Sequence, residues 1–440
     1  MSDPALIALS LCGALAGAGL GLLPGLHVYN VAGALLLFAA ASPDALPPEA
    51  LGMLMIGLVV GWAMTSALPT VFLFAPDDAG AGAILPATRA LLLGRGAEAS
   101  LLIGAGSLAA LVALVALAPL LDGLFRPLRA ILQEHTPWML CAVIAFLLLG
   151  EWPRVEATPG ASPARRLARA WAYLGAGLLT FVLSGLIGFA LMTRSPIPAE
   201  AAFQNLMPAF VGLFALPGLI QIATFGRRIP AQQWPTGLPI TPALWARATL
   251  TGLAGGLFAA FVPVISGGIG GLLAGHASAE RDERAFLISQ GASKIVYYVG
   301  SLLLLFIPGL SLTRGGMAWM LSSLYIPHGW RAFALSVAAA ALGGALSFWV
   351  LLLCARALSR IAHTVNPIAV AALAAALSLA MVAAFTGPAG LLVALAATPV
   401  GLIPVFVGGR RLNTLGVVLL PITLNAVGLG PWLARLLGLA

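Results

Sequence analysis

The stretch "GAGLGLLPGLHVYNVAGALL" (residues 17–36) decides the fold class. It is apolar and glycine-rich on both sides of Pro24, and a few polar residues follow the break. Proline cannot donate the backbone hydrogen bond that continues a helix, so nearby backbone groups lose their partners. At membrane depth such groups are tolerated only where protein or a cavity satisfies them. The stretch therefore predicts a broken or re-entrant helix in an integral membrane protein.

The composition of the whole chain agrees with this interpretation. Of its 440 residues, 61% are hydrophobic and 8% are charged, and the mean hydropathy is +1.04. Apolar runs long enough to cross a hydrocarbon core as a helix recur along the chain. The two-residue alternation typical of barrel strands does not. We therefore expect an all-α polytopic protein of the cytoplasmic (inner) membrane, with about 10–14 membrane segments.

The membrane segments follow from the apolar runs and the polar arcs between them. Three segments, 26–42, 137–150 and 264–278, are short for a crossing and favour re-entrant helices. The first run lacks a basic start and leads directly into the Pro24 break, which favours a membrane helix over a cleaved signal peptide. The other expected segments are 5–23, 50–75, 98–121, 168–192, 199–223, 241–262, 285–309, 331–354, 367–386, 388–407 and 413–429.

The charges and cysteines exclude several function classes. The 22 basic residues outnumber the 14 acidic ones, but most lie between apolar segments as membrane-flanking anchors, so nucleic acid is not an expected partner. Cys12, Cys141 and Cys354 lie in separate apolar segments without metal-ligand spacing and are interpreted as packing residues. No HExxH or P-loop motif is present. We therefore predict no metal centre, no resident cofactor and no ATP-driven chemistry.

The chain has the pattern of an internal duplication. The stretch "GGLFAAFVPVISGGIGGLLAG" (255–275) repeats the layout of residues 17–36, with Pro263 at the break. Each break is followed by a helix interrupted by polar residues. These two helices are "GWAMTSALPTVFLFAPDDAG" (61–80) and "ISQGASKIVYYVGSLLLLFIPG" (288–309).

Duplication with broken helices at matching positions is typical of secondary transporters, which hold substrate near the bilayer midplane between the repeats. We expect a first repeat at 1–195, a connecting segment at 196–240, and a second repeat with C-terminal helices at 241–440. Counting arginines on the two sides of the membrane does not decide the repeat orientation. The preference for inverted repeats rests on analogy with other transporters.

Polar residues in the breaks and interrupted helices are the candidate substrate-binding residues. Lys294 is the only lysine in the chain. It lies about ten residues beyond the charged start "ERDER" of its segment, a rise of roughly 15 Å into the membrane. A lysine at that depth is costly unless it meets a counter-charge or a ligand, and a lysine that snorkels to the headgroups is the alternative. The full set of candidates is Pro24, Gly25, His27, Tyr29, Asn30, Thr65, Ser66, Ser266, Gly267, Gly268, Ser293, Lys294 and Tyr297.

Asp77, Asp78 and His27 are the candidates for binding a coupling cation. The aspartates follow a proline-broken helix, where a carboxylate can lose solvation and bind a proton or Na⁺. Histidine changes charge near neutral pH. The structural alternatives are a hydrated helix end or an N-cap for the aspartates, and a hydrogen-bonded structural role for His27.

These motifs also resemble a known family. The run Pro24-Gly25-Leu26-His27, followed by "APDDAGAGAILPATRALLLGRGAEA" (75–99), resembles the large membrane subunit of the tripartite tricarboxylate transporters, especially its shorter stand-alone archaeal-type relatives. The chain departs from that pattern at "VPVISGG" (262–268), where a Pro-Gly pair is usual, and at Lys294, where a neutral Asn or Thr is expected. The resemblance implies two broken helices around a carboxylate substrate, driven by a proton or sodium gradient.

Three functional hypotheses stay open at this point. The leading one is an ion-coupled secondary transporter of a di- or tricarboxylate-like anion. The second is a translocase for a lipid-linked phosphate, because "VPVISGG" is similar to the breaks of polyprenyl-phosphate transporters. The third is an intramembrane lipid-modifying enzyme, for which the scattered His, Asp and Glu residues give little support. Besides membrane lipids, the expected partners are a second copy in a homodimer and, as the resemblance implies, a small membrane subunit and a soluble binding protein.

Overall fold

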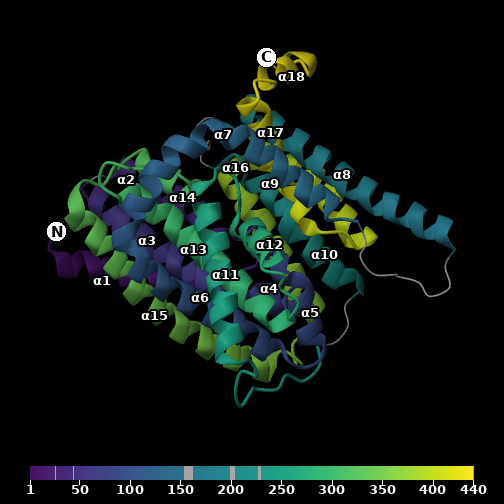
Figure 1. Ribbon diagram of the computed structural model, residues 1–440, viewed down its shortest axis with the longest axis horizontal. Coiled ribbons are helices and arrows are strands. Elements are labelled where there is room, and N and C mark those ends of the chain that lie inside the picture. The colour runs from purple at the N-terminus through teal and green to yellow at the C-terminus, as the bar shows by residue number, and fades with distance from the viewer. Residues whose placement is uncertain (25, 43, 153–161, 199–203, 226–228, 440) are drawn as a thin grey trace. The chain divides into compact units, whose positions relative to one another are not determined.

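The structure is a computed structural model that describes residues 1–24, 26–42, 44–152, 162–198, 204–225 and 229–439. Every regular element in this part of the chain is a helix (Figure 1). Eight helical runs there are long and apolar enough to cross a membrane, or up to nine if the bent pair Arg411–Ala426 and Gly430–Leu436 is one span. The described chain is therefore the all-α polytopic protein that the composition predicts.

The chain divides into two compact units, each built from two stretches of sequence. The first unit is Met1–Arg129 with Ile222–Ala374. Its helices are α1 (Asp3–Leu20), α2 (Val28–Ala41), α3 (Pro48–Thr65), α4 (Ala67–Phe72), η1 (Ala81–Ala83), α5 (Ile84–Leu92), α6 (Gly96–Leu117), η2 (Ala118–Leu120), α11 (Pro242–Phe261), α12 (Gly267–Ala277), α13 (Glu283–Phe306), α14 (Gly315–Ser322) and α15 (Gly329–Ile361).

The second unit is Ala130–Gln221 with Ala375–Ala440. Its helices are α8 (Pro163–Thr193), α9 (Met207–Phe210), the π-helix η4 (Val211–Ala215), η5 (Arg411–Leu415), α17 (Gly416–Ala426) and α18 (Gly430–Leu436), while α7 (Leu121–Leu149), α10 (Leu216–Phe225) and α16 (Pro367–Val407) cross the division. Each unit contains segments from both expected repeats. The division into units therefore does not test the expected repeat boundaries, which stay predictions.

Within the first unit, α3 and α13 run antiparallel. Near the start of α3, a Cβ on Gly52 would lie 3.5 Å from the Phe306 ring, which ends α13. Just past the end of α3, Ser66 is bonded to Lys294 in the middle of α13. In addition, α15 packs on α1 and α3, and α6 packs in the same way on α11 and α13. This matched, antiparallel arrangement is the one that inverted repeats would produce.

Glycines allow the paired helices to cross with their backbones in contact. A Cβ on Gly57 of α3 would lie 1.8 Å from the Ser10 carbonyl oxygen of α1. In the matching pair, a Cβ on Gly252 of α11 would lie 2.3 Å from the Ser289 carbonyl oxygen of α13. Small residues at such crossings are the usual basis of helix packing in membranes, where lipid offers little apolar driving force.

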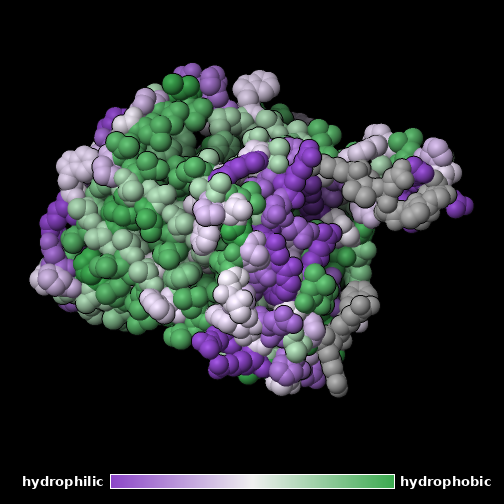
Figure 2. All heavy atoms as spheres, turned by 60° about the horizontal axis from the view of Figure 1, so that its bottom comes forward, coloured by the Kyte–Doolittle hydropathy of each residue, from purple (hydrophilic) through white to green (hydrophobic). Residues whose placement is uncertain are grey.

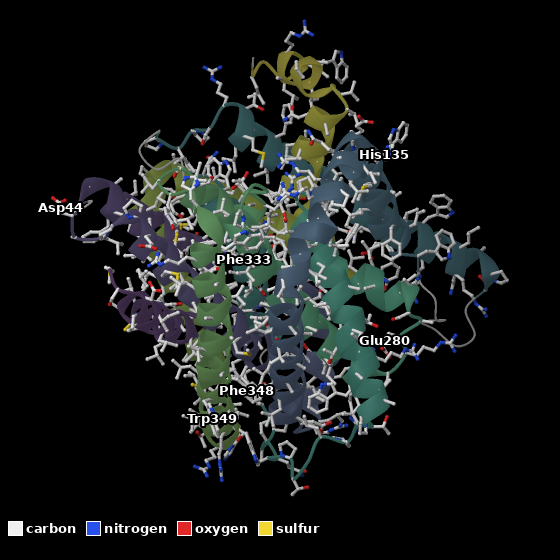
Figure 3. The ribbon with its side chains drawn as sticks, turned by 60° about the vertical axis from the view of Figure 1, so that its left-hand side comes forward. Asp44, His135, Glu280, Phe333, Phe348 and Trp349 are labelled. Carbon is white, nitrogen blue, oxygen red and sulfur yellow. The ribbon has the colours of Figure 1, made fainter. Side chains whose placement is uncertain are left out.

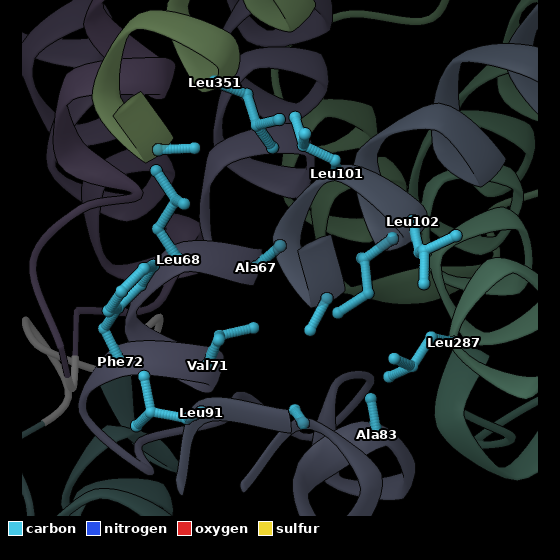
Figure 4. Packing of buried hydrophobic residues seen from close by; sticks show 14 of the residues in the cluster. Ala67, Leu68, Val71, Phe72, Ala83, Leu91, Leu101, Leu102, Leu287 and Leu351 are labelled. Carbon is cyan, nitrogen blue, oxygen red and sulfur yellow. The ribbon is translucent and has the colours of Figure 1, made fainter. Parts of the chain in front are cut away.

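An apolar cluster packs around the short helix α4, which directly follows the break at Ser66. Four side chains of α4 belong to this cluster: Ala67, Leu68, Val71 and Phe72 (Figure 4). They pack with Leu91 of α5, Leu101 and Leu102 of α6, Leu287 of α13 and Leu351 of α15. Because α4 is packed on several helices, the residues that follow it have a defined position.

The surface of α15 fits a helix that crosses a membrane. Trp330 and Trp349 are 57% and 66% exposed. They are separated along the helix by about 28 Å, close to the roughly 30 Å between the two interfaces where tryptophan is enriched. Figure 3 shows Phe333 near one end of α15, with Phe348 and Trp349 further along it. Hydrophobic side chains cover much of the surface visible in Figure 2.

In the second unit, Glu151 holds the turn before η5. Its Oε1 accepts hydrogen bonds from the Arg410 backbone N–H at 2.9 Å and from Asn413 Nδ2 at 2.7 Å. Gly177 of α8 makes room for it, because a Cβ there would lie 2.7 Å from Glu151 Cγ. Burial raises the pKa of the Glu151 carboxyl, since desolvation disfavours its charged form.

Most expected segments correspond to helices, with informative differences. Segment 137–150 is not a short re-entrant helix, because it forms the second half of the 29-residue α7, which continues through Pro137. Segments 26–42 and 264–278 are short as expected, with 14 residues in α2 and 11 in α12. The expected boundary between 367–386 and 388–407 coincides with Gly387, which has φ 66° inside α16. The first residues of segment 199–223 lie outside the described part of the chain.

Candidate functional site

Lys294 lies midway along α13 with its ammonium buried. Its side chain is 4% exposed, and Nζ donates hydrogen bonds to Asp77 Oδ1 and to Ser66 Oγ, both at 2.7 Å. Nζ also lies 5.2 Å from the centre of the Trp62 ring, within cation–π range. The lysine thus meets a counter-charge inside the protein, in place of the headgroup contact of a snorkelling side chain.

The break between α3 and α4 positions Ser66 for this contact. α3 ends at Thr65 and α4 begins at Ala67, so Ser66 is the hinge between them. The hydroxyl of Thr70 donates to the Ser66 carbonyl oxygen at 2.9 Å. A backbone group at the break is thus satisfied by a side chain of α4, and the Ser66 hydroxyl can accept from Lys294.

Asp77 and Asp78 lie in the loop between α4 and η1 and share one phenol. The Tyr298 hydroxyl lies 3.0 Å from Asp77 Oδ2 and 2.8 Å from Asp78 Oδ1. A phenol has a single proton and donates to one of these oxygens at a time. The other short oxygen–oxygen contact is stabilised only when a further proton or a cation is present.

His27 completes the group from the N-cap of α2. Its Nδ1 accepts a hydrogen bond from the Tyr29 backbone N–H at 3.2 Å. In neutral His27 the ring proton is then on Nε2. Nε2 lies 3.2 Å from both Asp78 Oδ1 and the Tyr298 hydroxyl, so the imidazole can donate to the carboxylate.

These side chains form a group suited to a cation. His27, Asp77 and Asp78 offer ligand atoms that all lie within 4.8 Å of one another. Two carboxylates face one ammonium, that of Lys294, so the described cluster lacks one positive charge when His27 is neutral. A proton or Na⁺ would supply it. These are the three residues that the sequence offers for a coupling cation, and the structure places them together although 51 positions separate His27 from Asp78.

Two glycines of α12 bring its N-terminus against the same group. A Cβ on Gly267 would lie 2.9 Å from Lys294 Cα, and one on Gly268 would lie 2.8 Å from the Ala79 carbonyl oxygen. The Ser293 hydroxyl donates to the Gly267 carbonyl oxygen at 2.7 Å, and the Ser266 hydroxyl contacts the Asp78 carbonyl oxygen at 3.5 Å. Residues of the second break therefore pack directly on the loop that carries the aspartates.

Backbone strain occurs beside both halves of the site. Phe74, shortly before Asp77, has φ 50°, and Val264, shortly before Ser266, has φ 68°. This left-handed region is unfavourable for residues with a Cβ and more so for a β-branched one. Val264 follows Pro263, where the family resemblance leads us to expect glycine, and it adopts a conformation that suits glycine.

The structure brings most sequence candidates together. His27, Ser66, Ser266, Gly267, Gly268, Ser293 and Lys294 lie in or against the group, with Asp77 and Asp78. The Thr65 hydroxyl instead donates to the Ala18 carbonyl oxygen of α1 at 2.8 Å. Tyr29 and Asn30 lie in the first turn of α2, Pro24 is half-buried before it, and the Tyr297 ring lies 4.8 Å from that of Tyr298. Gly25 lies outside the described residues.

Two residues outside the candidate set contact the group, and a third, Gln290, is buried one turn before Lys294 on α13. Tyr298 joins both aspartates to His27, and Trp62 stacks near Lys294. Gln290 is 2% exposed, and its two amide atoms lack hydrogen-bond partners in the described structure. Helical spacing from Lys294, at one turn in either direction, was the available signal for Gln290 and Tyr298.

The profile of the Tripartite tricarboxylate transporter TctA family matches residues 7–416. The chain belongs to the TctA family. A relative in Methanocaldococcus jannaschii, described as an uncharacterized protein, is 27% identical over 312 residues, which cover 70% of each chain. No solved structure matches. TctA proteins are large membrane subunits of tripartite transporters and form a family of transporters, not of enzymes. This chain is therefore a multi-pass membrane protein of the tricarboxylate-transporter type.

Proposed function

We propose that the protein is an ion-coupled secondary transporter of di- or tricarboxylates in the cytoplasmic membrane, with its site at the Lys294 cluster. The observation that carries the proposal is the buried Lys294–Asp77 pair, which joins the middle of the continuous helix α13 to the loop after the broken α3–α4 segment. An ammonium buried at this depth is costly unless it serves a function or a partner. Family membership supports an organic anion as substrate.

The surrounding groups have complementary roles in this proposal. Lys294 binds a carboxylate of the substrate, helped by the Ser66 hydroxyl and by backbone N–H groups at the start of α12. Asp77, Asp78 and His27 bind the coupling cation, a proton or Na⁺. Inverted repeats, as we expect them from the sequence, would supply two equivalent conformations that open to opposite sides of the membrane.

Uptake by the purified protein in liposomes tests this function. Labelled citrate is offered under an imposed Na⁺ or pH gradient, to the wild type and to Lys294→Met. We expect uptake to fall at least about tenfold in Lys294→Met, because one lost charge-assisted hydrogen bond is worth about 1.5–3 kcal/mol. Arg435→Met, which removes an exposed arginine of α18, is the matched control and should transport normally.

Two outcomes would contradict the proposal. Uptake by Lys294→Met at the wild-type rate would remove the lysine from the substrate site. Failure of the wild type to move any carboxylate, together with translocation of a short-chain polyprenyl phosphate in the same liposomes, would favour the lipid-linked phosphate as substrate. The membership of the TctA family favours the carboxylate.

A further inference from the structure

The ammonium that the proposed substrate needs is already engaged by the protein. Lys294 Nζ contacts Asp77 Oδ1 at 2.7 Å, and both side chains are about 95% buried. A carboxylate of the substrate would present the same chemistry to the same nitrogen. Asp77 therefore occupies the position on Lys294 that the substrate anion would take.

Asp77 and the substrate compete for the same ammonium. An ammonium has three donors, and one of them points to the Ser66 hydroxyl. Binding the substrate carboxylate beside Asp77 would place two carboxylates on one buried cation, and like charges in contact are strongly unfavourable away from water. The Asp77 carboxylate must therefore leave Lys294 or be neutralised when the substrate binds.

The neighbours of Asp77 determine where its charge can be neutralised. Its second oxygen already faces the Tyr298 hydroxyl at 3.0 Å, and Tyr298 leads to Asp78 and His27. The Asp77 side chain has one further partner, because Oδ1 also accepts a hydrogen bond from the Gly80 N–H at 2.9 Å. The ligand atoms of Asp77, Asp78 and His27 already lie within 4.8 Å of one another, so a carboxylate released from Lys294 stays beside that of Asp78.

We infer that Lys294 and Asp77 form an exchange switch: the substrate anion replaces Asp77 on Lys294, and the released Asp77 binds the coupling cation together with Asp78. This inference rests on the proposed function and gives its coupling mechanism. Without ligands the ion pair neutralises itself, and with both ligands each charge has a new partner. With the substrate alone, the released Asp77 carboxylate lies beside that of Asp78 without a cation, and two adjacent buried carboxylates are strongly unfavourable. The cation therefore strengthens binding of the anion, and the anion strengthens binding of the cation.

Binding measurements on Asp77→Asn test the switch. The dissociation constant for citrate is measured at fixed pH as Na⁺ replaces K⁺, and in a second series at fixed Na⁺ with varied pH, which separates Na⁺ from H⁺ as the coupling cation. In the wild type, one of the two cations should tighten citrate binding about 5- to 150-fold, the usual range for coupled sites. In Asp77→Asn the competitor for Lys294 is neutral, so citrate should bind tightly without the cation and respond less than about twofold to it.

Control variants separate this effect from general damage. Asp122→Asn, which removes a carboxylate paired with Arg126 on α7, should keep the full cation dependence. Asp77→Glu restores a carboxylate and should restore the dependence in part. If Asp77→Asn does not fold, the wild type still provides a test, because the switch requires citrate binding to respond to one of the two cations.

The outcomes distinguish the switch from the function on which it rests. Citrate binding by Asp77→Asn that keeps the wild-type cation dependence, or wild-type citrate binding that responds to neither Na⁺ nor H⁺, overturns the switch and leaves the transport function intact. A wild type that binds no carboxylate under any cation condition instead overturns the proposed function.

Discussion

Gly268 offers a direct test of how α12 positions the aspartates. In Gly268→Ala, the new Cβ would lie 2.8 Å from the Ala79 carbonyl oxygen and 3.1 Å from that of Asp78. Ordinary contacts begin at 3.4 Å, so α12 and this loop must separate by about 0.6 Å. That displacement acts on the segment that holds Asp77 at 2.7 Å from Lys294.

The expected size of the effect follows from this overlap. Inserting a methyl group into a packed interior costs about 1–3 kcal/mol. At 1.4 kcal/mol for each factor of ten, the fraction of the protein in which Asp77 contacts Lys294 falls about 5- to 150-fold. We therefore expect citrate uptake in liposomes to decrease at least fivefold in Gly268→Ala, with a lower melting temperature of the purified protein.

Gly275 of the same helix is the matched control. A Cβ there would lie 3.8 Å from the Phe286 ring, an ordinary contact, so Gly275→Ala should keep both uptake and melting temperature near the wild type. Equal uptake and equal melting temperatures in the two variants would refute the argument, because the close contact between α12 and the aspartate loop would then carry no energy.

Two further predictions concern stability. Val264→Gly should raise the melting temperature, because relief of the strained φ of 68° is worth about 1–2 kcal/mol. This gain exceeds the cost of about 0.5–1 kcal/mol from the greater chain entropy of glycine. Val262 has an ordinary φ of −82°, so Val262→Gly should lower the melting temperature, and a decrease in both variants would contradict the strain at Val264. Burial raises the pKa of Glu151 above its usual 4.5, so the folded state binds more protons than the unfolded state between the two pKa values, and stability should fall as pH rises through the folded pKa. Glu151→Gln, which keeps an acceptor for Arg410 and Asn413, should flatten that dependence when melting temperature is measured against pH, and an unchanged slope would exclude Glu151 as its source.

Much of the fold could be predicted because membrane helices carry their signal locally. An apolar run of sufficient length specifies a helix in lipid, since the backbone has no other way to satisfy its hydrogen bonds there. The break at Ser66, the short helices around residues 28–41 and 267–277, and the boundary at Gly387 are all visible as proline, glycine or polar interruptions. The same reasoning was wrong at Pro137, where α7 continues through the proline, because local propensity does not decide whether a helix kinks or ends.

The candidate site could be predicted only in part. Lys294 was conspicuous as a charge in an apolar helix, and the sequence by itself determined that it needs a partner at that depth. The partner was not determined, because Asp77, Asp78, His27 and Tyr298 come from three segments far apart in the chain. Only the tertiary structure decided that Asp77 pairs with Lys294, since this depends on the crossing of α3 and α13 and on the contact of α12 with the aspartate loop. A sequence specifies which charges must be compensated, whereas packing decides which atoms come within 3 Å of one another to compensate them.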